Sequence, residues 1–434
     1  MSLGGGMFLT QNKRIPGTYQ NFVSASRAGV ALSDRGTAAV PLVLDWGIEG
    51  EVFEVSNADF QKNSVKIFGY EYGHKKLKGL RDLFLNTQTL LAFRLSKNAV
   101  KASNTYAEAK YAGLRGNDLK IIIKKNVDDE LKFDVSTVLE TTVMDVQTVS
   151  KADELVANDW VTFKSAELEE TASTPLADGT NGDGPTTAEY QKFLDKIEAY
   201  SFNALGCPVV DEATAKLFIA FTKRMRDEVG AKFQCVVYKR ADANFEGVVS
   251  VENEAVDDNP ASLVYWTTGA EAGCAVNASV TNKRYDGEYE INVDYTQAQL
   301  AKALEEGKFM FHRVGAEIRV LEDINTFVEF TDTKNSDFSS NQIMRVLDQI
   351  ALDSANIFNS RYLGKVPNNE SGRISLWNEI VALHKQLQDI QAIENFVADD
   401  IKVAQGDTKK SVVLEEKVSP VSAMSILYMT VVIA

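Results

Sequence analysis

The chain has 434 residues, of which 44% are hydrophobic and 25% are charged, an ordinary balance for a folded globular protein. This length predicts two to four domains. The formal net charge of −15 repels phosphate, and no cluster of lysine and arginine with interleaved aromatic residues occurs, so nucleic acid is excluded as an expected partner. No apolar run reaches the roughly 18 to 20 residues that span a bilayer, which argues against membrane insertion.

The three cysteines, Cys207, Cys235 and Cys274, lie far apart and form no CxxC pair. They predict neither a disulfide framework nor a zinc site. The first residues, MSLGGGMFLTQNKRIPG, lack the apolar core of a signal peptide, so we expect synthesis in a reducing cytoplasm.

Residues 1–25 are predicted to form an extended arm. The run FLTQNKRIPGTYQNFVSA lacks helical periodicity and contains Pro16-Gly17, which breaks regular structure. Lys13, Arg14 and Arg27 precede the first carboxylate of the chain. This basic head is either a tail without a specific partner or a segment that complements the acidic body of another copy, and its charge favours the second interpretation.

Residues 26–98 are predicted to form a small α/β or α+β unit. The run TAAVPLVLDWG, which begins at Thr37, is typical of a buried strand, and Val52–Ala58 predicts another. Lys78–Thr89 predicts a short helix, and Leu90–Leu95 predicts a further strand.

Residues 99–171 change to short β-rich runs separated by turn-like clusters, which predicts an all-β insert. The expected strands are Leu119–Lys124, Leu131–Val138, Thr141–Val149 and Trp160–Lys164. Residues 172–188 contain the run ASTPLADGTNGDGPTT, which is rich in Gly, Thr, Asp and Pro and predicts a linker or a tight loop.

Residues 189–330 alternate helix and strand, which predicts an α/β domain with a mainly parallel sheet. One of its helices has Asp211 as the expected N-cap and Gly230 as the expected stop. Strands are expected at Phe202–Val210, Phe233–Tyr238 and Gly247–Val251, helices from Pro260 and at Gln297–Glu306, and a hairpin at Phe309–Val314 and Glu317–Glu322.

Residues 331–434 begin with two long amphipathic helices. The apolar stripe of the first runs from Ile343 to Phe358, and that of the second from Ile374 to Ile390. The runs Ile401–Val403 and Ser411–Val418 then predict a hairpin.

The last run, ILYMTVVIA, predicts a strand whose two faces are both largely apolar. Such a strand belongs inside a sheet, because an exposed edge without charge, Pro or Gly is an aggregation hazard. It either tucks into its own domain or completes a sheet in another subunit by strand addition. The expected contact residues are Leu427, Tyr428, Met429, Thr430, Val431, Val432 and Ile433.

No catalytic, cofactor or metal site is predicted. His74, His312 and His384 lie in three different segments, and no GxSxG, HExxH or GxxxxGK[ST] pattern occurs. The acidic loop Asp178–Gly184 is Gly-rich, but Gly182 stands where a calcium ligand is needed, so a linker turn is favoured over a calcium site.

Four segments carry a resemblance to a known family. They are the head TQNKRIPGTYQNF with the later LVLDWG, the run AKYAGLRGNDLKIII, the loop LADGTNGD and the end VSPVSAMSILYMTVVIA. In this order they resemble the N-terminus, the opening of the β-sandwich domain, the passage into the α/β domain and the closing segment of contractile-tail sheath proteins of myophages and defective prophages. The resemblance covers nearly the whole chain.

The resemblance implies a multidomain α+β and α/β fold. A discontinuous core domain would form from residues 26–98 and 331–434, with a β-sandwich insert and a subtilisin-like α/β insert without a catalytic triad. The terminal strand, 427–434, and the arm would pair with neighbouring subunits. The arm residues expected in these contacts are Ile15, Pro16, Gly17, Tyr19 and Phe22.

The function that the resemblance implies is a non-enzymatic subunit of a sheath that polymerises around a tail tube and contracts to drive the tube through the host envelope. The expected partners are other copies of the chain, the tail tube protein, and baseplate and tail terminator proteins. The protein is expected in the host cytoplasm before assembly and in the virion, as part of the tail sheath, after it. The alternative is a soluble α/β hydrolase or ligand-binding protein with a pocket in its α/β domain.

Overall fold

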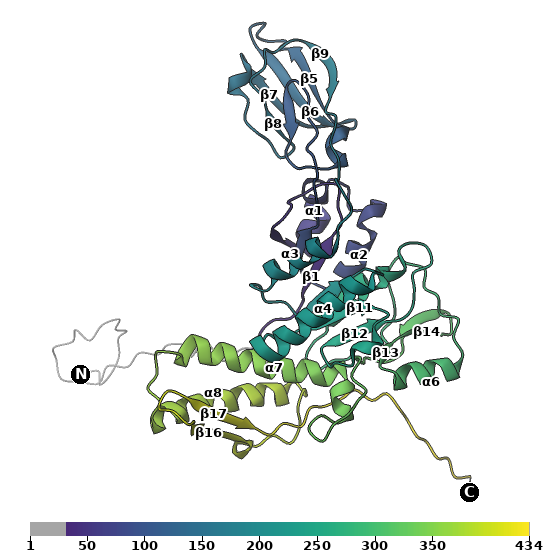
Figure 1. The fold of residues 1–434 in the computed structure, drawn as a ribbon, viewed down its shortest axis with the longest axis vertical. Coiled ribbons are helices and arrows are strands. Elements are labelled where there is room, and N and C mark those ends of the chain that lie inside the picture. The colour runs from purple at the N-terminus through teal and green to yellow at the C-terminus, as the bar shows by residue number, and fades with distance from the viewer. Residues whose placement is uncertain (1–31, 434) are drawn as a thin grey trace, which may run out of the picture.

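The computed structural model describes residues 32–433 (Figure 1). The molecule is elongated and has three parts. A β-sandwich lies at one end, a seven-stranded sheet flanked by helices lies in the middle, and two helices with a small hairpin lie at the other end. The arm predicted over residues 1–25 lies outside the described residues.

The central sheet has the strand order β13-β12-β11-β10-β1-β3-β2. Neighbouring strands are parallel throughout, except that β2 runs antiparallel to β3. The strands are β1 Thr37–Leu42, β2 Val52–Ser56, β3 Thr89–Arg94, β10 Ala204–Cys207, β11 Gln234–Tyr238, β12 Val248–Val251 and β13 Lys308–Phe309. The prediction of an α/β domain with a mainly parallel sheet is confirmed.

The sheet does not confirm the predicted core domain of residues 26–98 and 331–434. β1 pairs with both β10 and β3, so residues 37–94 belong to the same sheet as residues 204–309. The physical reason is burial. Every residue of β1 after Thr37 is buried, and a strand of this kind needs cover on both faces and a hydrogen-bonded neighbour on both edges.

Helices cover both faces of the sheet. α3 Thr187–Ile197 and α4 Glu212–Arg224 pack on one face, and α1 Asn57–Phe68, α2 Lys78–Phe84 and α5 Leu263–Gly273 pack on the other. The Asp211 side chain caps α4 as predicted, and the helical run ends as predicted at Gly230, which has a φ of +88°. α1 has no counterpart among the predicted elements.

Three further elements complete the α/β domain. α6 spans Gln297–Glu305, and β14 Phe311–Val314 pairs with β15 Glu317–Val320 as the predicted hairpin. The run from Phe309 is not one strand, because β13 ends there and joins the main sheet.

The β-sandwich contains a four-stranded sheet, β7-β6-β5-β9, and the pair β4-β8. Its strands are β4 Ala107–Ala109, β5 Leu119–Lys125, β6 Phe133–Leu139, β7 Thr142–Val149, β8 Val161–Phe163 and β9 Thr171–Pro175. β9 corrects the linker predicted over residues 172–188, because it pairs with β5 at the edge of the sheet. Bridges between residues 97–103 and 177–182 then give the sandwich a paired double connection to the rest of the chain.

The C-terminal part follows the prediction closely. α7 Asn341–Ile357 and α8 Glu370–Asp389 are the two amphipathic helices, and β16 Ile401–Gln405 pairs with β17 Val412–Glu416 as the hairpin. These elements share one apolar core, and α7 lies between this core and the α/β domain (Figure 1).

Gly269 lies where α5 packs closely on α2. A Cβ atom built at this glycine meets the Leu83 carbonyl oxygen at 2.3 Å. Alanine gains about 1 kcal/mol of helix propensity over glycine, but this contact cannot be relieved without moving a helix, which costs more. We expect Gly269→Ala to lower the midpoint of urea denaturation. Gly73→Ala, whose Cβ meets nothing within 4 Å, should leave the midpoint unchanged, and equal midpoints for both variants would contradict this packing.

Candidate subunit-interaction site

The C-terminal segment leaves the body of the molecule as an extended tail (Figure 1). Residues 421–433 belong to no helix or strand, and the side chains of Leu427, Tyr428 and Val432 are 85–90% exposed. The alternative in which this apolar run tucks into its own domain is therefore not what the structure shows. The other predicted contact residues of the segment, Met429, Thr430, Val431 and Ile433, are exposed as well.

The predicted contact residues of the N-terminal arm lie outside the described residues. They are Ile15, Pro16, Gly17, Tyr19 and Phe22. The described chain begins at Leu32, which packs against the apolar core of the C-terminal part.

The small sheet β16–β17 has an outer edge with free peptide groups. The Lys417 N–H donates to the Asp400 carbonyl oxygen, and hydrogen-bonded pairs recur at every second residue of an antiparallel ladder. The peptide groups of Val412, Leu414 and Glu416 therefore face away from β16, and they have no backbone partner among the described residues. Such an edge can accept an added strand.

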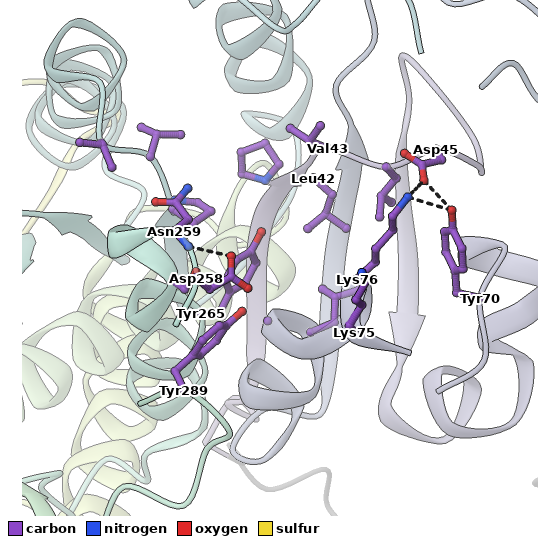
Figure 2. Close-up of a pocket in the computed structure, with 18 of the residues that line it drawn as sticks. Leu42, Val43, Asp45, Tyr70, Lys75, Lys76, Asp258, Asn259, Tyr265 and Tyr289 are labelled. Atoms are coloured by element: carbon purple, nitrogen blue, oxygen red, sulfur yellow. Dashed lines mark hydrogen bonds and ion pairs between the residues drawn. The ribbon is translucent and has the colours of Figure 1, made fainter. Parts of the chain in front are cut away.

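A cleft of about 680 Å³ lies beside the carboxyl ends of β1 and β10 (Figure 2). After β1 the chain builds β2 and β3 on one side of this point, and after β10 it builds β11 on the other. α/β proteins bind ligands at such switch points. The carboxylates here already have partners, because Asp45 accepts hydrogen bonds from Tyr70 and Lys76, and Asp211 caps α4. The cleft includes one serine, Ser262, and no histidine, so it offers no serine and histidine pair for nucleophilic catalysis.

The histidines do not converge. His74 caps a short helical turn, and His312 lies on β14. His384 is buried, with Nδ1 2.9 Å from the Ile380 carbonyl oxygen and Nε2 3.2 Å from a Glu416 carboxylate oxygen. Among residues 32–433, no group of three or more His, Cys, Asp or Glu side chains is placed to hold a metal ion.

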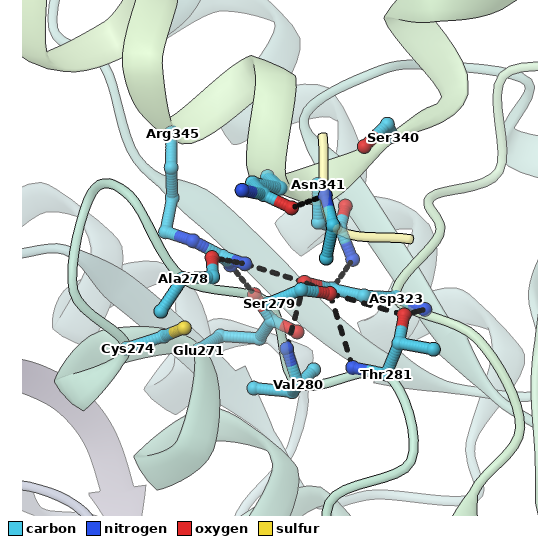
Figure 3. A network of polar contacts seen from close by, with 12 residues as sticks. Glu271, Cys274, Ala278, Ser279, Val280, Thr281, Asp323, Ser340, Asn341 and Arg345 are labelled. Carbon is cyan, nitrogen blue, oxygen red and sulfur yellow. Dashed lines mark hydrogen bonds and ion pairs between the residues drawn. The ribbon is translucent and has the colours of Figure 1, made fainter. Parts of the chain in front are cut away.

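A buried polar network joins α7 to the α/β domain (Figure 3). Arg345 on α7 donates to Glu271 on α5 at 2.5 Å and also to Asp323, and none of the three residues is more than 3% exposed. Burial and the nearby Asp323 raise the pKa of Glu271 to about 8. Burial alone would also raise the pKa of Asp323, but the charge of Arg345 and the hydrogen bonds that Asp323 accepts together outweigh burial and lower that pKa. One arginine thus faces two carboxyl groups, of which Glu271 keeps its proton to a higher pH than Asp323 does.

A second buried ion pair fixes the same helix. Arg226, in the turn after α4, donates to both carboxylate oxygens of Asp348 on α7 at 2.7 and 2.8 Å. The Gln234 amide also donates to Asn341 at 2.7 Å. These α7 residues are absent from the predicted site. Their spacing at positions 341, 345 and 348 places them on one face of a helix, which is the only sequence pattern that points to them. Polar residues at this spacing are equally typical of a solvent-exposed face, so the pattern does not predict a buried contact.

Four segments of the chain match domains of phage tail sheath proteins. Residues 35–95 match the N-terminal region of domain III of the tail sheath protein Gp18, 96–183 the β-sandwich domain, 183–326 the central domain and 333–434 the C-terminal domain. The chain is also 33% identical to the phage-like element PBSX protein XkdK of Bacillus subtilis strain 168, over 99% of both chains. The chain belongs to the phage tail sheath protein family.

Solved sheath structures have the same fold. The sheath tail protein of Desulfitobacterium hafniense is 36% identical, with a TM-score of 0.83 over 94% of this chain and 97% of that one. The contracted helical sheath of the anti-feeding prophage shares the fold at 12% identity, with a TM-score of 0.55 over 97% of this chain and 99% of that one. The protein is thus a structural subunit of a contractile tail sheath and a virion component, and the comparisons give no support to a hydrolase or ligand-binding protein. Within residues 32–433, no helix is both long and apolar enough to cross a membrane.

The raised pKa of Glu271 makes the stability of the sheath subunit depend on pH. The pKa of Glu271 is about 8 in the folded chain, against an ordinary value of 4.5, so the folded state keeps a proton that the unfolded state loses. The stability that this bound proton gives the folded state is fully present below pH 4.5 and is lost as the pH rises through about 8. We expect the free energy of unfolding to fall over this range by at most about 1.4 kcal/mol per pH unit.

Glu271→Gln tests this expectation, because glutamine stays neutral at every pH. Urea denaturation at several values between about pH 6 and pH 9 should give a smaller fall in midpoint for this variant than for the wild type. The exposed Glu370→Gln is the matched control and should keep the wild-type dependence. Equal pH dependence in the wild type and Glu271→Gln would show that no proton is held at this site.

Proposed function

We propose that sheath subunits are joined by exchanged strands. In this proposal the C-terminal segment, Leu427–Ile433, of one copy adds to the outer edge of β17 in another copy. The observation that carries the proposal is an apolar run that the sheets of its own chain leave uncovered. The basic arm, through Ile15, Pro16, Gly17, Tyr19 and Phe22, makes a second exchange contact with an acidic neighbour.

The proposed role of this lattice is mechanical. The sheath surrounds a tail tube, shortens, and drives the tube through the host envelope, after assembly in the host cytoplasm. Its partners are other copies of the chain, the tube protein, and baseplate and tail terminator proteins. The α/β domain acts as a scaffold of subtilisin-like fold without a catalytic triad. Membership of the sheath family supports this role.

The edge of β17 is a better acceptor than the edge of β16. The Trp377 indole on α8 donates to the Ile401 carbonyl oxygen of β16 at 2.9 Å, so part of that edge is already occupied. The outward peptide groups of β17 have no such partner among residues 32–433. An added strand can therefore pair along β17 without displacing a contact.

The energy of one exchanged strand is small. Roughly six main-chain hydrogen bonds give about 0.5 to 1.5 kcal/mol each, and several buried apolar side chains give about 1.5 to 3 kcal/mol each. Ordering each residue of the strand costs about 1 to 2 kcal/mol, which cancels most of this gain. A durable lattice therefore depends on two arms per subunit, because the second contact forms at high effective concentration.

Deletion of residues 427–434 tests the donor strand. We expect the truncated chain to remain folded and monomeric and to form no sheath-like tubes at a concentration where the wild type polymerises. Negative-stain microscopy and analytical ultracentrifugation measure this outcome, with Met424→Ala as the control outside the strand. Tubes formed by the truncated chain would rule out exchange by this segment.

Leu414→Pro tests the acceptor edge. Proline lacks the N–H that an added strand needs, but the Leu414 N–H faces away from β16, so the hairpin keeps its own ladder. We expect this variant to fold with an unchanged circular dichroism spectrum and to lose tube formation. If Leu414→Pro assembles into normal tubes, the outer edge of β17 is not the acceptor.

A further inference from the structure

Both ends of the described chain are tied to one helix, α7. The chain enters beside the second half of the helix, where Ser33 contacts Gln349 and Asp353. It leaves beside the first turn, where Ala423 contacts Gln342. Gln342 and Asp353 are separated by about 16 Å along the helix axis at 1.5 Å per residue.

At the entry point, two buried side chains of α7 hold the backbone. The Ser33 N–H donates to Asp353 Oδ1 at 3.3 Å, and the Ser33 hydroxyl donates to the same carboxylate. Gln349 Nε2 donates to the Ser33 carbonyl oxygen at 3.2 Å and to Asp353 Oδ2 at 2.7 Å. Gln349 and Asp353 are 2% and 3% exposed, so the entry point is fixed by groups that water does not reach freely.

At the exit point, one buried amide of α7 holds the backbone, two residues after the Val421 N–H donates to the Ala392 carbonyl oxygen. The Ala423 N–H donates to Gln342 Oε1 at 2.9 Å, and Gln342 is 4% exposed. The other end of the same amide lies 3.4 Å from the Asn277 carbonyl oxygen of the α/β domain. Residues 424–433 form no hydrogen bond with any other described residue, so Ala423 is the last fixed point before the exposed segment.

α7 itself cannot slide or turn easily. Arg345 and Asp348 hold one side of the helix to the α/β domain through buried ion pairs. Val346, Ile350 and Ile357 pack the other side into the C-terminal core. Breaking one buried pair leaves an unpaired charge and costs about 3 to 5 kcal/mol, so the helix keeps its position relative to both units.

We propose that α7 is a strut that fixes the distance between the two arm roots, Ser33 and Ala423, in the extended and the contracted sheath alike. This inference rests on the proposed strand exchange, because only joined arms put the helix under tension. Force that enters by one arm then passes along α7 to the other. Gln342 and Asp353 are the positioning residues, since each holds one root on the helix.

Spin labels at Asp34→Cys and Ser422→Cys test the strut, because both positions are exposed and adjoin the two roots. The background is full-length Cys274→Ser, since Cys207 and Cys235 are fully buried. We expect a narrow distance distribution by double electron–electron resonance in the free subunit. The same distribution should persist in extended and in contracted tubes.

Gln342→Leu and Asp353→Ala should each broaden this distribution, because each removes a contact that ties one root to α7. The matched controls are Gln386→Leu and Asp389→Ala on α8, which should leave it narrow, and thermal melts check that all four variants fold. Three outcomes would overturn the proposal. They are a broad distance distribution in the parent chain, an unchanged distribution in both root variants, and a distribution that shifts on contraction. Failure of strand exchange would show separately as absent tubes, while the free subunit still reports on the strut.

Discussion

The buried ion pairs of α7 are the constraint on which the rest of the subunit depends. Each charge taken out of water costs several kcal/mol, and only close, multiple hydrogen bonds offset that cost. Arg345 with Glu271 and Asp323, and Arg226 with Asp348, meet this requirement with contacts between different domains. The central sheet and the C-terminal core therefore behave as one body joined through α7.

Charged contacts fix this joint more narrowly than apolar contacts could. An apolar helix face tolerates a small shift because its packing is not directional, whereas two N–H groups of one guanidinium reach both oxygens of a carboxylate in one orientation only. Arg226 and Asp348 form such a bidentate pair. A subunit that swings within a lattice without changing its own shape benefits from a joint of this kind, since motion is then confined to its ends.

Local sequence patterns predicted most elements but not how distant segments combine. The amphipathic stripes of α7 and α8 and the hairpin β16–β17 follow from periodicity alone. The place of β1 between β3 and β10 depends on burial across a sheet assembled from distant segments, which no local pattern encodes. β9 was not predicted, because its Thr-rich, Pro-containing run has the composition of a linker. The buried contacts of Arg345 and Asp348 were not predicted, because charged residues usually lie at the surface.

One part of the candidate site could likewise be predicted from the sequence, and the other parts could not. The exposed apolar segment could be predicted from the residues of Leu427–Ile433 alone, although the structure assigns it to no strand. The proposed acceptor, the outer edge of β17, could not be predicted from the sequence, because the direction of a peptide group depends on the register of the hairpin. The roots of the arms depend on contacts such as that between Ser33 and Asp353, which lie 320 positions apart in the sequence.

An exposed apolar strand is a hazard unless its encounters are directed. A strand that moved freely would meet other apolar surfaces as readily as its intended edge, which is the origin of edge aggregation. Fixing its root at Ala423 limits the volume that the strand searches and so raises its effective concentration near one acceptor. In the proposed exchange, the small surplus energy of each strand is then sufficient, because the fixed root lowers the entropy that pairing must overcome.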